Sequence, residues 1–379
     1  MVLEVIPLPI RWYSIVYNTT GYADEARNML MHLDEEKFQI KLIPMDKQNN
    51  TLEVLDHKSK NKIYRMMQGP EQPNSVNIKW LPVNWIKKDP NAIANINRTM
   101  FETDRIPADW VKTCNNMDEI WVPSQFNVET FTGAGVSQDK LFVIPGGIDP
   151  DIFSTDVTPA SWPEKRGFNF LSIFEWTDRK GWDVLLKAYF AEFTIKDDVA
   201  LMLKVNVPGV DSTVKIHQQL FGFIRSLGLT PENIPAVYLI HKFFTSQEMP
   251  ALYAACDAFI LPSRGEGWGR PYMEAMAMGL PTIGTRWSGQ TEFMHDNNSY
   301  LIDIDGLEDI PRTIDIPIFR GQRWARPSLE HTRALMRQVY ENREQARKKG
   351  TIARQEIIEK WSWHKSAEKV EQRLESYTT

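Results

Sequence analysis

The sequence predicts an α/β protein made of two similar halves, each with a parallel sheet covered by helices on both faces. Short apolar segments alternate with amphipathic helical segments along the 379 residues. This alternation is typical of parallel sheets with helices on both sides, and the length suggests two or three domains. Residues 149–167 are rich in proline, serine and threonine and are predicted to be an interdomain linker.

The first half begins with an alternation of predicted strand and helix. Residues 12–17 are expected to form a strand, residues 21–36 an amphipathic helix and residues 38–44 a second strand. Further strands of this half are expected, in chain order, at residues 76–81, 92–101, 120–124 and 141–144.

The second half has a clearer pattern. Strands are expected at residues 168–174, 237–240, 258–261 and 281–284. A helical stripe follows the first of these strands, and its apolar members are Trp182, Leu185, Leu186, Tyr189 and Phe193. The charged residues 328–360 are predicted to form a long solvated helix, and residues 366–377 a last amphipathic helix.

The composition argues against several classes of protein. Hydrophobic and charged contents of 42% and 25% are ordinary for a soluble globular chain. The net charge of −5 gives no general basic field for nucleic acid. Neither a leader peptide nor a membrane span is expected, because no apolar run approaches 18 residues. Cys114 and Cys256 are interpreted as buried thiols of a reducing compartment, so a cytoplasmic protein is expected.

Residues 264–281 carry the strongest functional pattern. Glu266 and Glu274 lie eight positions apart in a segment that follows a predicted strand and opens a helix with Pro271 in its first turn. A glycine-rich turn before a helix N-terminus offers free N–H groups and a positive dipole end to an anion. Since the flanking carboxylates can hold pairs of hydroxyls, the expected ligand is a sugar or ribose joined to phosphate. The alternative is one solvated glutamate and one glutamate that only balances the helix dipole.

A second candidate anion site follows the strand at residues 168–174. The motif Asp178-Arg179-Lys180-Gly181 comes directly before the predicted helix. Two cations beside a helix N-terminus suit a diphosphate. The alternative is an ordinary basic surface loop.

The spacing of Glu266 and Glu274, with Gly267, Gly269 and Pro271 between them, resembles the signature of the family-four retaining glycosyltransferases of the GT-B fold. The resemblance runs over most of the chain and is strongest between residues 168 and 304. It implies two Rossmann-like domains with parallel sheets that face a central cleft. The implied domains are an acceptor-side domain at residues 1–155, a nucleotide-sugar donor domain at residues 156–360 and a closing helix at residues 361–379 that packs back on the first domain.

The resemblance also implies roles for individual residues. Lys180 would stabilise the departing diphosphate, and Arg179 would substitute for an arginine that the family carries earlier in this loop. Glu266 would bind hydroxyls of the sugar, and Glu274 those of the ribose. The expected donor-binding residues are Gly21, His241, Gly267, Trp268, Gly269, Arg270, Glu274, Ser288 and Gly289.

Glu102 completes the expected catalytic residues, which are Arg179, Lys180, Glu266 and Glu102. It follows a predicted strand, at the edge where open α/β sheets bind ligands. Either Glu102 or Asp104 orients the acceptor hydroxyl, or the cluster is a local salt bridge with Arg98 or Arg105.

Three donor-binding assignments have alternatives. Gly21 either lets the backbone approach a ligand or adopt a positive φ, or it belongs to an ordinary strand-to-helix turn. His241 lies beside the nucleotide base, or it is a capping or core histidine. Arg270 reaches the phosphates, or it pairs with an acidic neighbour.

The implied reaction moves a hexose-type sugar from a nucleotide diphosphate to an acceptor hydroxyl, with retention of configuration. The acceptor is a glycan, a lipid-linked molecule or a small molecule. Neither a metal nor a further cofactor is expected, because the cations are side chains. The alternatives are another GT-B enzyme, such as a nucleotide-sugar epimerase, and a non-catalytic nucleotide-sugar-binding module.

A basic aromatic patch is a further expectation, and its members are Trp80, Trp85, Lys87 and Lys88. The patch either touches a lipid-linked acceptor at a membrane surface or is a covered edge of the sheet. The base and sugar of the donor, the acceptor and the oligomeric state are not specified by the sequence.

Overall fold

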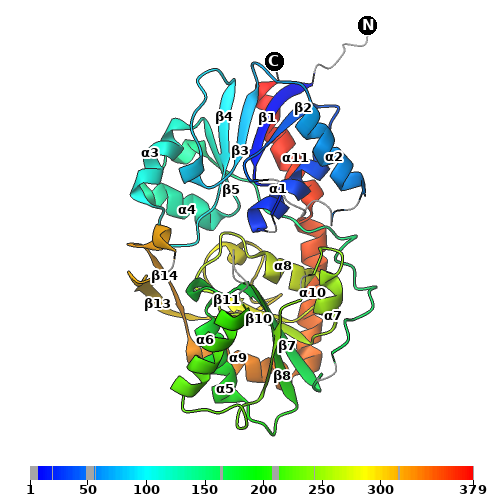
Figure 1. The fold of residues 1–379 in the computed structure, drawn as a ribbon, viewed down its shortest axis with the longest axis vertical. Helices are drawn as coiled ribbons and strands as arrows, with labels where there is room; N and C mark the ends of the chain where they lie inside the picture. Colours follow the sequence, from blue (N-terminus) through cyan, green and yellow to red (C-terminus); the bar gives the residue numbers. More distant parts are fainter. Residues whose placement is uncertain are drawn as a thin grey trace. The chain divides into compact units, whose positions relative to one another are not determined.

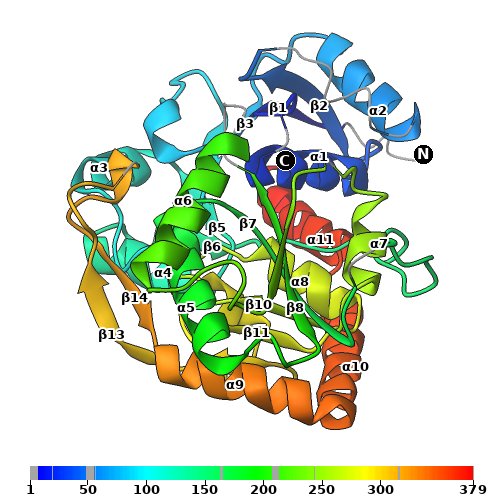
Figure 2. The same cartoon turned by 60° about the horizontal axis from the view of Figure 1, so that its bottom comes forward.

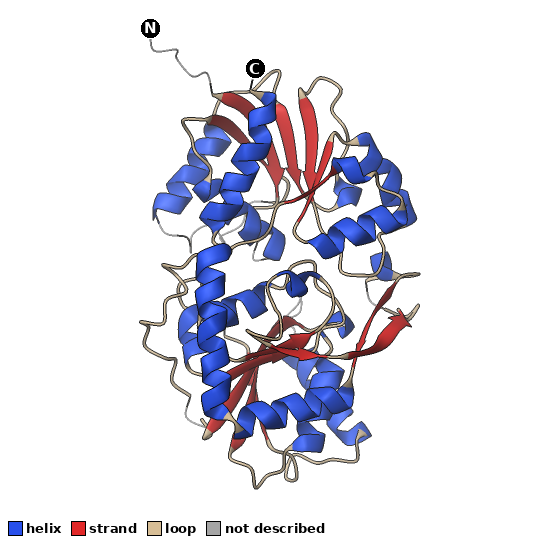
Figure 3. Cartoon of the chain, turned by 180° about the vertical axis from the view of Figure 1, so that it is seen from behind, coloured by secondary structure: helices blue, strands red, loops and turns tan. Residues whose placement is uncertain are grey.

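The computed structural model describes residues 7–18, 20–47, 55, 57–162, 165–206, 213–242, 244–314 and 316–378. The chain divides into two compact units. The first comprises Met1–Gly147 and Lys360–Thr379, and the second comprises Ile148–Glu359. Each unit contains a six-stranded parallel sheet flanked by helices (Figures 1 and 3). The predicted fold class is therefore confirmed. Residues 163 and 164 of the expected linker lie outside the described residues.

The sheet of the first unit has the strand order β2-β1-β3-β4-β5-β6. Its strands are β1 (Leu8–Ser14), β2 (Phe38–Pro44), β3 (Val76–Trp80), β4 (Ala94–Arg98), β5 (Glu119–Val122) and β6 (Leu141–Val143). Its helices are α1 (Gly21–His32), α2 (His57–Gln68), α3 (Ala108–Asn116), α4 (Gln125–Ala134) and α11 (Trp363–Leu374). Strand β1 begins at Leu8, whereas the predicted strand began at residue 12. The prediction missed the true start because Pro9 lies inside the strand and pairs with β2, and proline is unusual in such a position.

The sheet of the second unit has the strand order β12-β11-β10-β7-β8-β9. Its strands are β7 (Phe168–Glu175), β8 (Val199–Asn206), β9 (Ala236–Ile240), β10 (Ala258–Leu261), β11 (Thr282–Thr285) and β12 (Tyr300–Ile302). Its helices are α5 (Trp182–Glu192), α6 (Thr213–Ser226), α7 (Met249–Ala254), α8 (Arg270–Ala277), α9 (Leu329–Glu341) and α10 (Arg343–Lys360). Helices α5 and α9 pack side by side (Figure 2).

Several parts of the second unit differ from the expectation, and its strands β8 and β12 lie outside every predicted strand. The long helix predicted for residues 328–360 is two helices, α9 and α10, because the backbone at Asn342 leaves the helical conformation. An antiparallel hairpin of β13 (Ile304–Asp309) and β14 (Arg323–Pro327) was not predicted. The burial of its first strand is irregular, so the sequence gives no clean alternation over residues 304–309.

The closing helix α11 belongs to the first unit. Apolar residues on one face of α11 lie in the same core as strands β1 to β5 and helix α1; they are Trp363, Ala367, Val370 and Leu374. Its C-terminal end is fixed by a charged contact. Arg373 donates to both carboxylate oxygens of the buried Glu119 at 2.8 and 2.9 Å, and the Tyr377 hydroxyl donates at 2.7 Å.

This contact gives a prediction for stability. The substitution Arg373→Met should lower the free energy of unfolding by about 2 kcal/mol, because it leaves the Glu119 carboxylate buried without its cation, although Arg373 itself is partly solvated. Urea denaturation measures the change. Lys37→Met is the matched control, because Lys37 also binds α11, at Glu371, but through an exposed ion pair. Equal losses for the two variants would contradict the assignment.

Candidate active site

Three loops meet at the carboxyl edge of the second sheet. They follow β7, β10 and β11, whose ends lie at one edge because the strands are parallel. The Arg264 N–H donates to the Arg179 carbonyl at 2.7 Å and joins the first loop to the second. The Gly289 N–H donates to the Glu266 carbonyl at 2.9 Å and joins the second to the third. Residues that are far apart in the sequence therefore form one surface.

The side chains of Lys180 and Glu266 form a buried ion pair in this region. The Lys180 ammonium donates to the two Glu266 carboxylate oxygens at 2.6 and 2.8 Å. The Arg179 guanidinium lies 3.3 Å from Glu266 Oε2 and donates to the Gly265 carbonyl at 2.6 Å. The side chains of Arg179, Lys180 and Glu266 are 12%, 10% and 7% exposed. Both neighbouring cations thus reach the same carboxylate.

The electrostatics of this cluster favour an anionic ligand. Burial raises the pKa of the Glu266 carboxyl, but Lys180 and Arg179 outweigh the burial, so its pKa lies below the ordinary value. Glu266 is therefore charged at neutral pH. Among these three side chains, two positive charges face one negative charge, in a place where water screens them poorly.

Two glycines permit the tight course of these loops. Gly181 has a φ of +65°, and a Cβ there would lie 2.0 Å from the Pro262 carbonyl oxygen. Gly269 has a φ of +93°, and a Cβ there would lie 2.8 Å from the Tyr272 ring. Both glycines directly precede helices, α5 and α8. Only glycine tolerates both the backbone conformation and the close approach.

Glu274 lies one turn inside α8 and is held by two side chains. The Tyr253 hydroxyl donates to one of its oxygens at 2.8 Å, and the Arg270 guanidinium donates to the other at 3.2 Å. Burial, with the Glu274 charge added to it, raises the pKa of the Tyr253 phenol well above its ordinary value. Of the two alternatives for Arg270, the pairing with an acidic neighbour is seen. Tyr253 is a neighbour that the sequence reasoning missed.

Lys204 is a second residue that the sequence reasoning missed. It lies near the end of β8, where burial lowers the pKa of its ammonium and the Glu274 charge partly opposes the shift. Its Nζ lies 5.9 Å from the centre of the Phe244 ring. A single lysine in the apolar run of residues 199–205 was the available signal.

The remaining predicted residues of the signature and of the β11 loop support the turn at Glu266. The Trp268 side chain is 1% exposed and packs against Phe293 at 5.0 Å, so its ring belongs to the core. The Ser288 hydroxyl accepts the Glu266 N–H at 2.9 Å. The Gly267 backbone approaches Gly289 closely, because a Cβ on Gly289 would lie 2.1 Å from the Gly267 carbonyl oxygen.

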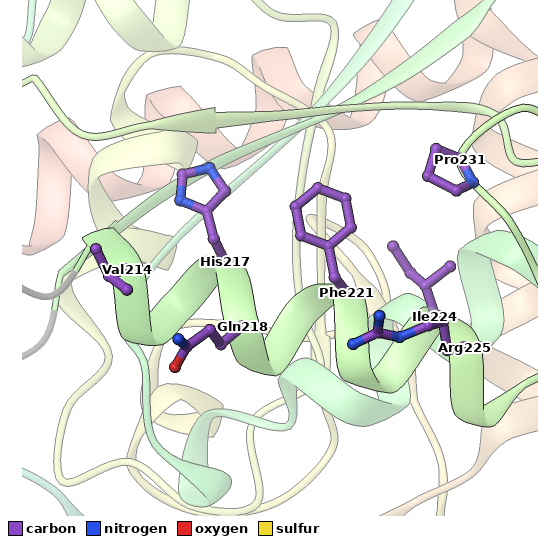
Figure 4. A pocket seen from close by; sticks show the side chains of 7 residues that line it. All are labelled: Val214, His217, Gln218, Phe221, Ile224, Arg225 and Pro231. Atoms are coloured by element: carbon purple, nitrogen blue, oxygen red, sulfur yellow. The ribbon is translucent and has the colours of Figure 1, made fainter.

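His241 lies at a different part of the second unit, directly after β9. Its side chain is exposed, which rules out a core histidine, and its ring lies 5.3 Å from that of His217 on α6. Both histidines line a groove of about 630 Å³ between α6 and β9. An adjoining hollow of about 470 Å³ is formed by one face of α6 and by Pro231 (Figure 4). Neither hollow is lined by Lys180 or Glu266, so the ion-pair cluster marks a separate place.

Gly21 and Glu102 belong to the first unit. Gly21 begins α1 after the N-cap Thr20, and its φ is not positive, so the expected use of a positive φ is not found. Glu102 follows β4. Burial is the main cause that raises the pKa of the Tyr22 phenol to about 12, and the Glu102 charge contributes to the same shift.

The salt-bridge alternative for the residues around Glu102 is found in part. Arg105 pairs with Asp104 at 3.1 Å, whereas Arg98 is completely buried and pairs with Glu25 at 3.0 Å. Arg98 therefore belongs to the interior of the first unit.

The prediction of a basic aromatic patch is wrong for one residue, Trp80. Trp80 is completely buried and stacks on Trp12 at 5.3 Å, because it lies in the central strand β3. Trp85 is 50% exposed, and Lys88 pairs with Asp118 at 2.8 Å.

None of the helices in the described part of the chain is long and apolar enough to cross a bilayer. Over the same residues, histidine, cysteine and carboxylate side chains form no group of three or more that could hold a metal ion.

Comparison with known proteins gives matches to glycosyltransferases. Residues 166–314 match the family described as Glycosyl transferases group 1. Mannosylfructose-phosphate synthase of Agrobacterium fabrum is 29% identical over 161 residues, which are 41% of this chain and 34% of that protein. A GDP-mannose-dependent alpha-(1-6)-phosphatidylinositol monomannoside mannosyltransferase of Mycolicibacterium smegmatis is 26% identical over 206 residues, 51% of this chain and 50% of that protein. The chain thus spans half or less of the length of these relatives.

Solved structures extend the likeness to the whole chain. Sucrose-phosphate synthase of Thermosynechococcus elongatus has a TM-score of 0.69 at 15% identity and covers 98% of this chain and 99% of its own. Anabaena HepE in complex with UDP-glucose has a TM-score of 0.64 at 14% identity, with coverage of 97% and 100%. At such identities the likeness establishes the fold. The expected resemblance is confirmed: residues 166–314 match the glycosyl transferases group 1 family, within a chain that has the GT-B fold.

Proposed function

We propose that this chain is a retaining glycosyltransferase that moves a hexose-type sugar from a nucleotide diphosphate to an acceptor hydroxyl. The observation that carries the proposal is the convergence of Arg179, Lys180 and Glu266, with Glu274 on the helix that follows. The cations suit a diphosphate, and the two carboxylates suit the hydroxyls of a sugar and a ribose. The relatives named for mannose transfer and the HepE complex with UDP-glucose support a hexose donor.

The proposed chemistry is mainly electrostatic. Breaking the anomeric bond puts positive charge on the sugar ring and negative charge on the departing diphosphate. Lys180 and Arg179 stabilise that departing charge, as do the N–H groups at the starts of α5 and α8. The leaving phosphate then accepts the proton of an acceptor that attacks on the same face of the sugar. No pair of carboxylates of the glycosidase type is needed for this route.

The donor must compete with Glu266 for Lys180. The ammonium is held by both oxygens of the Glu266 carboxylate. A bound diphosphate shares this ammonium, and Glu266 is then released in part to accept hydrogen bonds from the sugar hydroxyls. Breaking an internal pair costs binding free energy, but the rearrangement links the leaving-group site to the sugar site. Because Lys180 serves the diphosphate and Glu266 serves the sugar hydroxyls, substitutions of the two residues should have different effects.

The proposed role of Lys180 gives a prediction for the rate of transfer. The substitution Lys180→Ala should lower the rate of sugar transfer by about 100-fold or more, because one preorganised donor to the departing charge is lost. A radiolabelled donor assay measures the rate, and circular dichroism checks the fold. Lys349→Ala is the matched control, because Lys349 is another partly buried lysine of the same unit and donates to the carbonyls of Asp296 and Ser299, away from the Lys180–Glu266 pair. Wild-type turnover of the Lys180 variant would remove its assigned role.

A further prediction separates the two roles of Glu266, as a competitor for the Lys180 ammonium and as a partner of the sugar hydroxyls. The substitution Glu266→Gln should keep or raise the affinity for UDP or GDP, by up to about fivefold, because neutral glutamine no longer competes for the ammonium. The same variant should lose about 100-fold in transfer, since the sugar hydroxyls lose a charged acceptor. Calorimetry and the donor assay give the two numbers. A variant that loses nucleotide affinity as strongly as transfer would show that Glu266 serves only the structure of the loop.

A further inference from the structure

Arg264 connects three separate segments of the second unit through its guanidinium. Its Nη1 donates to the Asp178 carbonyl at 2.6 Å and to Asp183 Oδ1 at 2.8 Å, and its Nη2 donates to Asp183 Oδ2 at 2.9 Å. Its Nε donates to Glu308 Oε1 at 3.1 Å. Asp178 begins the loop that carries the two cations, Asp183 lies in the first turn of α5, and Glu308 lies in β13. Lysine, with one ammonium, could not span these acceptors in the same geometry.

Arg264 and Asp183 are both charged in the folded protein. The Arg264 side chain is 12% exposed. Burial alone would lower its pKa, but Asp183 and Glu308 outweigh burial and raise it. Burial likewise raises the pKa of Asp183, and Arg264 outweighs it, so the pKa of Asp183 lies below its ordinary value. A bidentate pair in such surroundings has a well-defined geometry.

The backbone of Arg264 adds two further contacts. Its N–H donates to the Arg179 carbonyl at 2.7 Å, and its carbonyl accepts the Ala325 N–H at 2.9 Å. The buried Trp324 donates its indole N–H to Glu308 Oε1 at 3.0 Å. The β13–β14 hairpin is therefore fixed to Arg264 by both backbone and side-chain contacts. Phe319, between the two strands, lies 5.9 Å from the Arg179 guanidinium.

We propose that Arg264 is a positioning residue of the diphosphate-binding loop, and that the β13–β14 hairpin supports Arg264 through Glu308 and Ala325. The proposal rests on the function proposed above. Arg264 binds the carbonyl of the residue directly before the two cations, and it lies two positions from Glu266, which accepts both of them. The residue that fixes the loop and the residue that aligns its cations thus lie on the same turn. Arg264 need not touch the donor to set where Arg179 and Lys180 point.

Arg337 offers a matched control at the other end of α5. It donates to Glu192 Oε1 at 2.8 Å and to the Glu192 carbonyl at 2.7 Å, and it lies 3.5 Å from Asp197. Like Arg264, it therefore binds one carbonyl and more than one carboxylate, and a third carboxylate, Glu341 of its own helix, lies 3.8 Å away. Glu192 and Asp197 belong to the C-terminal end of α5 and the segment that follows, whereas the cation loop precedes the helix.

The experiment compares Arg264→Gln with Arg337→Gln. In hydrogen exchange measured by mass spectrometry, the amides of residues 176–181 should exchange at least about tenfold faster than in the wild type in Arg264→Gln, and at the wild-type rate in Arg337→Gln. Calorimetry with UDP, UMP, GDP and GMP should show that the preference of the wild type for the diphosphate falls by about tenfold or more in the same variant only. A role in general stability would lower the melting temperature of both variants and leave this preference unchanged. Wild-type exchange at residues 176–181 in Arg264→Gln would overturn the proposal, as would an unchanged preference.

A second variant covers the case in which Arg264→Gln does not fold. Asp183→Asn keeps an oxygen for the guanidinium but removes its charge, so the same two changes should occur to a smaller extent. Failure of the proposed function is distinguishable from failure of this inference. If the wild type binds neither UDP nor GDP, the function is wrong, and the exchange of residues 176–181 alone decides whether Arg264 positions the loop.

Discussion

The buried ion pair of Lys180 and Glu266 is the interaction on which the proposed site depends. A pair of charges removed from water gains stability only when its hydrogen bonds are well made, and here the ammonium binds both oxygens of the carboxylate. A buried ion pair of this kind therefore need not stabilise the fold. The proposed function accounts for it in another way, because the diphosphate would bind Lys180 and the sugar would bind Glu266.

The parallel sheet of the second unit brings the two partners together. Lys180 follows β7 and Glu266 follows β10, and these strands are neighbours in the sheet although 86 positions separate the two residues. Gly181 and Gly269 then allow both loops to turn sharply into helices. Arg264 connects the two loops through its backbone and its side chain. The geometry of the site is thus a property of the strand order and of the contacts between the loops.

The sequence predicted most strands of the two sheets but missed β8 and β12, and it predicted the connections between loops poorly. Strands β2 and β10 have the predicted bounds, because short apolar runs between turns are a local signal. The meeting of Lys180 with Glu266 depends on strand order, which no local pattern contains. Trp80 was misplaced in a surface patch because its neighbours in sequence are basic, whereas the sheet buries it against Trp12. The contacts of Arg264 could not be predicted from the local sequence either, because its partners Asp183 and Glu308 are distant in the chain.

A crystal structure with UDP or GDP bound is the most direct test of the central claim. The account predicts a phosphate oxygen within about 3 Å of the Lys180 ammonium, with the ribose hydroxyls on Glu274 and the Glu266 carboxylate turned partly away from Lys180. A nucleotide seated elsewhere, for example in the groove between α6 and β9, with the Lys180–Glu266 pair unchanged, would contradict it.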